Sequence, residues 1–375
     1  MILSFLHVRN FRNFADLRLD VPAEGLALVG DNGQGKTNLL EAIYYLSIFR
    51  SFRGAPDEQL VRFGEDVFRV EGRFATPEGP REVAAAFDRR SRKKKVTVGG
   101  AEPERLGDAI GTASVVVFSP SDLAIVAGSP GERRRFLDIV LSLTRSGYLG
   151  ALQRYRQVLS QRNALLRQGV SEAMVGAWDA GLVEWGSRVI AARAAWVEER
   201  AAGFARHVRA IAGEGDAALD YESSVPLGDA GQPPTPAAIA GAFLEALERA
   251  REREQRRAMT LVGPHRDDLR LRADIAGTRA DLRTYGSGGQ QRTAAVALRM
   301  VEAESLKESS GREPVILLDD VFAELDPGRS RRILEWIEQE EGGQVILTAP
   351  KATDVDLRGG TLPRLTIRDG TLSAL

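Results

Sequence analysis

The chain has 375 residues, which is more than one hydrophobic core usually fills, so two lobes or domains are expected. Hydrophobic residues make up 43% and charged residues 27% of the sequence, and the formal net charge is −1. This composition predicts a soluble globular protein and argues against binding of polyanions over the whole surface, although local basic patches remain compatible with it.

Several kinds of site are excluded by residue counts. Cysteine is absent, which excludes disulfides, thiol nucleophiles and cysteine zinc sites. The three histidines, His7, His207 and His265, are too scattered in the sequence to predict a metal cluster. No apolar run approaches the roughly 18 residues that a membrane span requires. Residues 1–6 lack the basic start of a signal peptide, so the chain is expected in the cytoplasm.

The first predicted element is a β-hairpin. Residues 3–8 alternate apolar and polar side chains, and Leu17, Leu19 and Val21 repeat the alternation. The turn between them carries Asn10, Arg12 and Asn13. These polar side chains either approach a nucleotide or form an ordinary polar turn, and the sequence does not decide between the two.

A glycine-rich turn follows the apolar run 26–29. It reads GxxxxGK[ST] and consists of Gly30, Asp31, Asn32, Gly33, Gln34, Gly35, Lys36 and Thr37. A buried strand precedes it and residues 38–46 continue it with helical spacing, which is the context of a phosphate-binding P-loop. Glycines let the backbone wrap phosphates, and the helix N-terminus directs free N–H groups at them. We therefore predict ATP binding, with Lys36 at the β- and γ-phosphates and Thr37 as a ligand of Mg²⁺; a glycine turn without a ligand is the alternative.

Two basic segments follow. Arg50 and Arg53 are candidates for contact with a phosphate of a nucleotide or of DNA. Residues 67–74, 82–87 and 95–98 are predicted to be strands of a meander. The tip between the last two strands carries six basic residues in seven, Arg89, Arg90, Arg92, Lys93, Lys94 and Lys95. Such a run is either solvated surface or a contact with the nucleic-acid backbone.

Residues 130–258 are predominantly helical in pattern. Their Ala-, Arg-, Glu- and Leu-rich composition predicts long antiparallel helices, interrupted at Gly147, Gly169 and within residues 181–186. Strands are predicted again at residues 259–262 and from Leu269. The expected organisation is a first ATPase lobe with a β subdomain (1–129), a helical insertion (130–258) and a return to the ATPase core (259–375).

Another glycine-rich segment precedes a helix that runs to about Lys307. It consists of Ser287, Gly288, Gly289 and Gln290, and the serine and glutamine have the spacing of a capping box. Capping alone does not require two glycines at a helix N-terminus, whereas close approach of backbone N–H groups to a phosphate does. A simple helix cap is the alternative interpretation.

The apolar run 315–318 predicts a buried strand, and two carboxylates end it in the Walker B arrangement. Asp319 is expected to hold Mg²⁺. Asp320, one residue further, is placed to orient or activate the attacking water, so Lys36, Asp319 and Asp320 form the predicted catalytic set. A solvated acidic strand end is the alternative.

The order of these motifs, with most of the chain between the P-loop and the Walker B strand, is the layout of ABC-type ATPase heads. In such heads the signature helix of one subunit completes the ATP site of another. Over essentially its whole length the chain resembles the RecF family, the bacterial recombination-repair branch of the SMC-like ATPases. The resemblance is carried by residues 10–14, 30–37, 118–120 with 122–123, 133–138, 263–267, 287–292 and 317–326.

The resemblance implies an α/β fold, with an ABC-type P-loop head of mixed sheet, an antiparallel β subdomain and a helical insertion lobe. It implies ATP and Mg²⁺ as cofactors, an ATP-dependent homodimer, binding of duplex, gapped or junction DNA, and slow DNA-stimulated ATP hydrolysis. It also implies cooperation with RecO and RecR in loading RecA, support of replication restart and SOS induction, and no membrane partner. By the same resemblance, Arg12 belongs to the ATP site, Ser287 to Gln290 form the signature acting in trans, and Glu324 and Asp326 belong to the D-loop.

Two departures from the broader ABC pattern argue against fast, transporter-like turnover. Ala349 follows Thr348 where transporters usually carry a switch histidine, and Ser119 and Pro120 stand where a Q-loop glutamine is expected. An ABC transporter ATPase subunit would use the same motifs, but it would normally be shorter, carry the histidine and bind a membrane partner. A non-catalytic interaction protein would need a damaged motif, and none of the motifs here is damaged.

Overall fold

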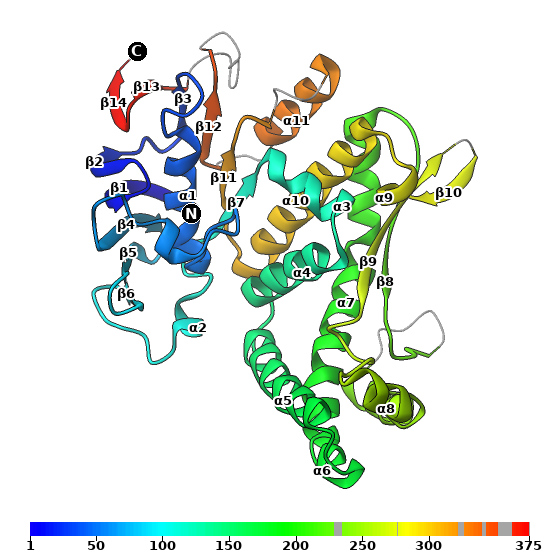
Figure 1. The fold of residues 1–375 in the computed structure, drawn as a ribbon. Helices are drawn as coiled ribbons and strands as arrows, with labels where there is room; N and C mark the ends of the chain where they lie inside the picture. The colour runs from blue at the N-terminus through cyan, green and yellow to red at the C-terminus, as the bar shows by residue number, and fades with distance from the viewer. Residues whose placement is uncertain (229–234, 276, 322–325, 340–342, 352–361, 375) are drawn as a thin grey trace. The chain divides into compact units, whose positions relative to one another are not determined.

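The computed structural model describes residues 1–228, 235–275, 277–321, 326–339, 343–351 and 362–374 (Figure 1). The chain divides into two compact units, unit 1 with Met1–Leu123 and Ala295–Leu375, and unit 2 with Ala124–Ala294. Within the described ranges, no helix is both long and apolar enough to cross a membrane.

Unit 1 contains a six-stranded mixed sheet with the order β14-β13-β3-β12-β11-β7. All neighbouring strands in it are parallel except the pair β13 and β14. The strands are β3 (Gly25–Val29), β7 (Val115–Phe118), β11 (Val315–Leu318), β12 (Val345–Ala349), β13 (Arg364–Arg368) and β14 (Thr371–Ala374). Strands β3, β11 and β12 are buried along their whole length, as expected for a parallel sheet covered on both faces. Because β3, β11 and β12 run in the same direction, the residues that follow them meet at one edge of the sheet.

A second sheet of unit 1 is antiparallel, with the order β2-β1-β4-β5-β6. Its strands are β1 (Ile2–Phe11), β2 (Phe14–Asp20), β4 (Val67–Thr76), β5 (Gly79–Asp88) and β6 (Lys93–Val98), so the predicted hairpin and meander are confirmed. Helix α1 (Lys36–Ile48) packs against strands of both sheets and is buried on nearly all sides (Figure 1). The P-loop therefore enters a helix that belongs to the core of the unit.

Shorter helices complete unit 1. They are a 3₁₀ helix at Asp57–Gln59, α2 (Leu106–Ala109), a 3₁₀ helix at Pro120–Asp122 and α11 (Pro327–Gln339). Helix α10 (Gly288–Ser310) contains the boundary between the units, and α3 (Leu123–Ala127) begins at the other boundary.

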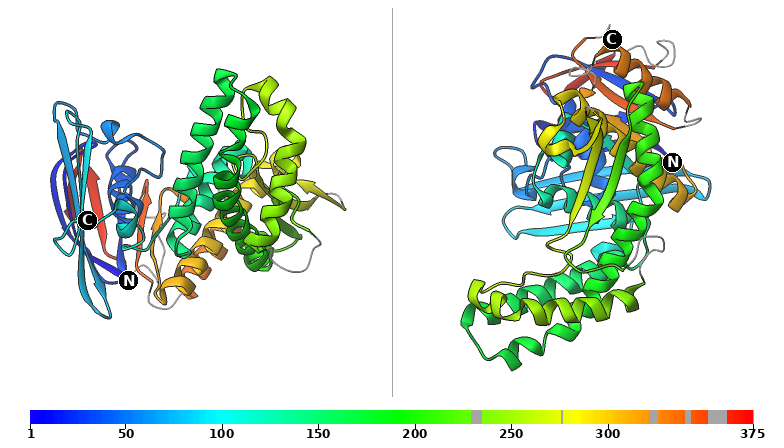
Figure 2. Two further views of the ribbon diagram at one scale, coloured as in Figure 1. Left: turned by 90° about the horizontal axis from the view of Figure 1, so that it is seen from below. Right: turned by 90° about the vertical axis from the view of Figure 1, so that its right-hand side faces the viewer.

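Unit 2 is built mainly from long helices. They are α4 (Pro130–Thr144), α5 (Tyr148–Gln168), α6 (Glu172–Gly176), α7 (Asp179–Ala212), α8 (Pro236–Arg257) and the short α9 (Leu282–Tyr285). Helices α5 and α8 both pack along α7, which has 34 residues (Figure 2). The predicted breaks at Gly147 and Gly169 are confirmed, since both glycines cap α5 with positive φ. The predicted break within residues 181–186 is wrong. Gly186 lies inside α7, where a Cβ would come within 2.5 Å of the Phe243 ring, so this glycine permits close helix packing.

A three-stranded antiparallel sheet, β10-β9-β8, also belongs to unit 2. It consists of β8 (Ala217–Glu222), β9 (Asp268–Ile275) and β10 (Thr278–Asp281). Because β9 pairs with β8, the first part of segment 259–375, which was expected to return to the ATPase core, belongs to unit 2. The strand predicted at residues 259–262 is wrong. The amide of Thr260 donates to Asn163 Oδ1 (2.8 Å) and that of Leu261 to Glu254 Oε1 (2.7 Å), so side chains take the place of a β-ladder.

Candidate functional site

The P-loop joins the end of β3 to α1. Gly35 caps α1 with φ 112°, and a Cβ there would lie 2.5 Å from the Asn13 amide nitrogen, so this position requires glycine. The Lys36 side chain is buried, and its Nζ donates to the carbonyl oxygens of Gly30 (2.6 Å) and Asp31 (3.2 Å). The ammonium group is thus held inside the turn, where it would face a phosphate bound by the loop.

Two hairpins hold the P-loop from outside. Asn13 Nδ2 donates to the Gln34 carbonyl (3.0 Å), and its Oδ1 accepts from Asn38 Nδ2 (2.8 Å). On the other side, the amides of Asp369 and Gly370, in the β13–β14 turn, donate to Gln34 Oε1 (2.8 Å) and to its carbonyl oxygen (3.2 Å). The loop is therefore fixed in shape before any ligand binds. Sequence reasoning placed Asn13 near a possible nucleotide but missed the contribution of the C-terminal hairpin.

Arg12 is positioned by a buried carboxylate. Its Nε and Nη2 donate to the two oxygens of Glu41 (2.8 and 2.9 Å), and its Nη1 donates to the Gln59 carbonyl (3.1 Å). Glu41 lies on α1 with no exposed surface, accepts a hydrogen bond from Ser51, and has Arg53 at 3.9 Å. A buried carboxylate that loses one partner is costly, so this cluster fixes both arginines near the P-loop helix. A direct contact of Arg12 with ATP stays a prediction.

The two Walker B carboxylates lie at the carboxyl end of β11, beside the start of α1. Thr37 Oγ1 donates to Asp319 Oδ1 at 2.8 Å. Asp320 has φ 47°, and its amide donates to Thr348 Oγ1 (2.9 Å) at the end of β12. The same hydroxyl lies 3.3 Å from Asp319 Oδ1 and 3.2 Å from Asp320 Oδ1. The structure thus brings together one end of the P-loop and both carboxylates.

Thr348 was missed as a site residue. In the sequence, residues 348 and 349 were compared only with the switch-histidine position of transporters. The only signal in the sequence was the apolar run 345–347 before Thr348. Thr348 lies near the carboxyl end of buried β12, which pairs in parallel with the Walker B strand, Leu318 opposite Leu347, so the structure brings it to the same sheet edge as the two carboxylates.

The electrostatics of Asp319 suit a divalent cation. Burial raises the pKa of the Asp319 carboxyl, and the charge of Asp320 raises it further, while hydrogen bonds from Thr37 and Thr348 lower it. A carboxylate penalised by burial and by a second carboxylate is favoured in its charged form by a nearby cation. Hydroxyl and carboxylate oxygens are ligands that Mg²⁺ prefers. Thr37 and Asp319 therefore fit the metal role expected of them.

The capping box predicted at α10 is confirmed. The Ser287 amide donates to Gln290 Oε1 (2.9 Å), and the Gln290 amide donates to Ser287 Oγ (3.2 Å). Ser287 and Gly288 are exposed, and a Cβ on Gly288 would meet nothing closer than Arg292 Nη1 at 3.9 Å. Packing within the described chain therefore does not account for this glycine. Glycine there leaves the N-terminus of a long helix bare.

The D-loop candidates are described only in part. Glu324 lies outside the described residues. Asp326 is exposed, and its Oδ1 accepts from the amide of Arg329 (3.0 Å) at the start of α11 while Oδ2 lies 3.2 Å from Arg329 Nε. In this structure Asp326 acts as a helix cap.

The segment expected to hold a Q-loop glutamine has a structural contact of its own. Asp122 accepts from the Ser119 amide (2.8 Å) and pairs with buried Arg299 of α10 (2.5 Å). Arg299 also pairs with Glu302 (2.6 Å). This ion-pair cluster links the end of the β7 region to α10 within unit 1, and it identifies no residue with the Q-loop role.

The basic run lies at the β5–β6 hairpin, where most of its members pair with acidic neighbours. The pairs are Arg89 and Arg90 with Asp66, Arg92 with Glu58, and Lys95 with Glu102. Exposed pairs of this kind contribute about 1 kcal/mol or less, so they exchange readily for a phosphate. Lys93 and Arg50 are exposed, and the Arg53 side chain is 45% exposed. DNA contact by these residues stays a prediction.

Lys94 differs from the rest of the run. Its Nζ lies 2.8 Å from Asp57 Oδ2, donates to the Phe49 carbonyl (2.5 Å) and sits over the Tyr45 ring. Burial lowers its pKa, against the opposing effect of Asp57. These contacts favour a role in the fold, and the predicted contact of Lys94 with DNA gains no support from this geometry.

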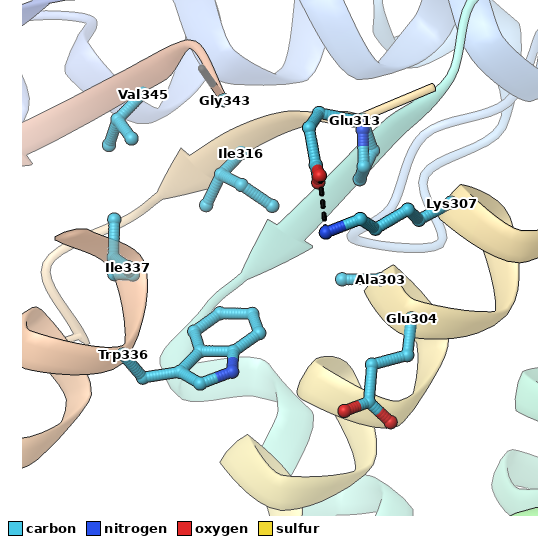
Figure 3. Close-up of a pocket in the computed structure, with 10 residues that line it drawn as sticks. Ala303, Glu304, Lys307, Glu313, Ile316, Trp336, Ile337, Gly343 and Val345 are labelled. Carbon is cyan, nitrogen blue, oxygen red and sulfur yellow. Dashed lines mark ion pairs between the residues drawn. The ribbon is translucent and has the colours of Figure 1, made fainter. Parts of the chain in front are cut away.

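A small hollow lies elsewhere in unit 1, between α10, β11 and α11 (Figure 3). The Trp336 ring and apolar side chains line it, and the ion pair of Lys307 with Glu313 (2.5 Å) crosses its rim. Its volume of about 20 Å³ holds little more than one water molecule. It is therefore too small for a nucleotide.

Comparisons with known proteins agree with this geometry. The family of AAA ATPase domains matches residues 1–73, which include the P-loop. The chain is 39% identical to the DNA replication and repair protein RecF of Synechococcus sp. (strain JA-3-3Ab), over 90% of this chain and 89% of the relative. It is 33% identical to the protein of the same name from Bacillus subtilis (strain 168), over 95% of each chain.

Solved structures give the same result. A structure of the recombination mediator protein RecF with ATP, in the RecFOR pathway, superposes with a TM-score of 0.90 at 32% identity, covering 100% of this chain and 97% of the other. The Smc head domain of Pyrococcus furiosus superposes with a TM-score of 0.58 at 16% identity, covering 100% of this chain and 96% of the other, a likeness of fold. The predicted fold class, an SMC-like ABC-type head, is therefore confirmed.

Proposed function

The chain belongs to the RecF family of DNA replication and repair proteins, and we propose that it is an ATPase that dimerises on duplex or gapped DNA when ATP is bound. The observation that carries the proposal is the 2.8 Å hydrogen bond between Thr37 and Asp319. It joins the two halves of a nucleotide site that are separated by most of the sequence. The solved relative with ATP supports the same ligand.

In the proposed ATP complex, the P-loop amides and the N-terminus of α1 surround the phosphates. Lys36 exchanges its bonds with the Gly30 and Asp31 carbonyls for bonds with β- and γ-phosphate oxygens. Asn13 and the β13–β14 turn keep the loop in the binding conformation, which reduces the entropy lost on binding.

For hydrolysis, Thr37 and Asp319 would hold Mg²⁺, which when bound neutralises charge that develops on the phosphates. Asp320 would accept a hydrogen bond from the attacking water and orient it toward the γ-phosphate. Thr348 holds the Asp320 amide and therefore fixes the position of that carboxylate. We propose a slow reaction, because Ala349 stands where fast transporters carry a histidine, and the family assignment favours stimulation of the reaction by DNA.

We further propose that the ATP site is completed in trans. Ser287 and Gly288 would present the N-terminus of α10 to the γ-phosphate on a second copy of the chain, with Gly289 and Gln290 following in the same turn. A helix N-terminus stabilises an anion within about one turn. ATP then joins two subunits, and ADP, which lacks the γ-phosphate, does not. In the cytoplasm, the family assignment favours action with RecO and RecR in loading RecA, and support of replication restart and SOS induction.

The test is sedimentation of the wild-type chain with ATP and with ADP, each with and without gapped DNA. The proposal expects dimers with ATP, a larger dimer fraction when gapped DNA is added, and monomers with ADP. Equal sedimentation with both nucleotides would contradict it. If the protein co-purified with membranes, the alternative of an ABC transporter ATPase subunit would be favoured. The sequence argues against this alternative, because Ala349 stands where transporters usually carry a histidine.

Asp320→Asn is expected to bind ATP and dimerise with near-normal affinity but to hydrolyse ATP at least about a hundredfold more slowly, because an amide does not serve as proton acceptor for the attacking water. Single-turnover hydrolysis and sedimentation of the same sample measure the two properties separately. Asp16→Asn, at an exposed carboxylate of β2, is the control. A wild-type hydrolysis rate in Asp320→Asn would show that another group organises the water.

Replacing Arg89, Arg90 and Arg92 together with glutamate is expected to weaken DNA binding equally for all sequences. Each lost phosphate contact should reduce the slope of log affinity against log salt by about 0.9 for duplex DNA. Lys94 is left intact because its contacts with Asp57 and Phe49 belong to the fold. Arg18→Glu, at an exposed position of β2, is the control for a charge reversal outside the hairpin. An unchanged slope would mean that the hairpin is only solvated surface.

A further inference from the structure

Two motifs that the proposed ATP site does not use converge on one pocket of unit 2. The first is the arginine-rich start of α4, residues 133–138, and the second is the turn 263–267 before β9. Arg134, Arg135 and Asp138 from the first motif and Pro264 and His265 from the second line a cavity of about 260 Å³. Helices α5 and α7 supply the remaining wall. The cavity is far larger than the 20 Å³ hollow of unit 1.

The pocket carries an excess of positive charge. Four arginines line it, Arg134, Arg135, Arg156 and Arg193, and Asp138 is the only carboxylate among the described lining residues. Asp138 already accepts three hydrogen bonds, from Tyr148 Oη (2.6 Å), Arg193 Nη2 (2.8 Å) and Arg156 Nη2 (2.8 Å). Among the described lining residues, one carboxylate thus stands beside four arginines.

Arg193 and Arg134 are held by neutral groups as well. Buried Arg193 donates to the Pro264 carbonyl (2.6 Å) and to Tyr148 Oη (3.1 Å). Arg134 Nη1 donates to the Asp267 carbonyl (2.8 Å), a backbone oxygen. Burial lowers the pKa of Arg134 and repulsion from the charge of Arg193 lowers it further, against the opposing charges of Asp268, Asp267 and Asp138. An anion in the pocket would relieve this repulsion.

The other polar groups of the pocket add no negative charge. His265 lies 2.6 Å from Tyr155 Oη through Nδ1 and 3.1 Å from the Thr260 carbonyl through Nε2. Burial lowers its pKa to about 4, so the ring is neutral near pH 7. Gly131, in the first turn of α4, also lines the pocket, and the positive end of a helix favours an anion there.

We propose that this pocket binds a phosphate monoester, with Arg134 and Arg156 as the groups that contact the anion. Arginine is the side chain best suited to phosphate oxygens, because its planar fork donates two parallel hydrogen bonds. Several arginines at one site fit a terminal phosphate, which carries up to two negative charges, better than a phosphate within a strand, which carries only one. The group has two possible sources, the end of a nucleic-acid strand or free phosphate.

Binding of inorganic phosphate is measured first, by calorimetry in the Lys36→Ala background, so that the P-loop does not contribute. Saturable binding is expected, and adding Arg134→Gln with Arg156→Gln should weaken it at least about tenfold, because each lost charge-assisted bond is worth about that factor. The second measurement uses labelled gapped duplexes with phosphate or hydroxyl at the gap ends. If a strand end is the source, removal of its phosphate weakens binding to the wild type and leaves binding to the double variant unchanged.

Two controls separate binding from folding. Arg249→Gln, an exposed arginine on α8 outside the pocket, should behave as the wild type in both measurements. The double variant Arg134→Lys with Arg156→Lys keeps the charge and should recover part of the phosphate affinity. It replaces the glutamine variants in the test if those variants unfold. If inorganic phosphate binds but removal of the terminal phosphate does not change the affinity for gapped DNA, the site is assigned to free phosphate. The proposal is overturned if neither inorganic phosphate nor the terminal phosphate distinguishes the folded pocket variants from the wild type.

Discussion

Lys36→Ala is expected to reduce ATP affinity by at least about a hundredfold and to abolish every ATP-dependent behaviour of the chain. The ammonium group lies inside the P-loop, and it would give at least two charge-assisted bonds to the phosphates, each worth about a factor of ten or more. The fold should survive, because the contacts of Nζ are with the loop's own carbonyls. Calorimetric titration with ATP and thermal unfolding of the same samples provide the measurement.

The control for Lys36→Ala is Lys307→Ala, which removes a half-exposed lysine of the same unit that pairs with Glu313. It should leave ATP affinity unchanged. If Lys36→Ala is folded and binds ATP as tightly as the wild type, the P-loop assignment is wrong.

Ser287→Arg is expected to bind ATP as a monomer with near-normal affinity and neither to dimerise nor to hydrolyse it. The P-loop of the altered chain is intact, whereas the bulky side chain would block the bare N-terminus of α10, which we propose contacts the second subunit. DNA binding by this variant should no longer respond to ATP. Sedimentation with ATP, a hydrolysis assay and DNA titrations with and without ATP test these three statements.

Two comparisons make the Ser287→Arg result specific. Ser287→Ala removes the cap, at a cost of about 1 kcal/mol in stability, but leaves the surface open, so it should still dimerise. Mixing Ser287→Arg with Lys36→Ala should restore at most one site per heterodimer, formed by the intact P-loop of one chain and the intact signature of the other. Normal dimerisation and turnover by Ser287→Arg alone would leave Ser287 as no more than a helix cap.

The parts of the site that the sequence predicts are those built from neighbouring residues. A buried strand, a glycine turn and a helix follow one another at the P-loop, and the Walker B carboxylates directly follow their strand, so each pattern is complete within a few residues. The closeness of Thr37 to Asp319 could be expected only because both motifs imply the same metal ion, and their hydrogen bond was not predicted.

The unpredicted parts depend on pairing between distant segments. Thr348 lies beside the Walker B carboxylates because β12 pairs with β11. The β13–β14 turn can bind Gln34 because β13 pairs with β3. Residues 259–262 have a strand-like composition, but amide bonds to Asn163 and Glu254 decide their conformation. Single-sequence patterns contain no information about such partners.

The backbone at Asp320 determines which substitution is useful there. With φ at 47°, the residue has the left-handed conformation, which asparagine adopts at little cost and most other side chains do not. Asp320→Asn therefore changes the charge of the carboxylate without adding strain, whereas alanine or glutamate would also disturb the turn after β11. Asparagine at this position is accordingly the variant of choice for trapping an intact ATP-bound assembly on DNA for crystallography or electron microscopy.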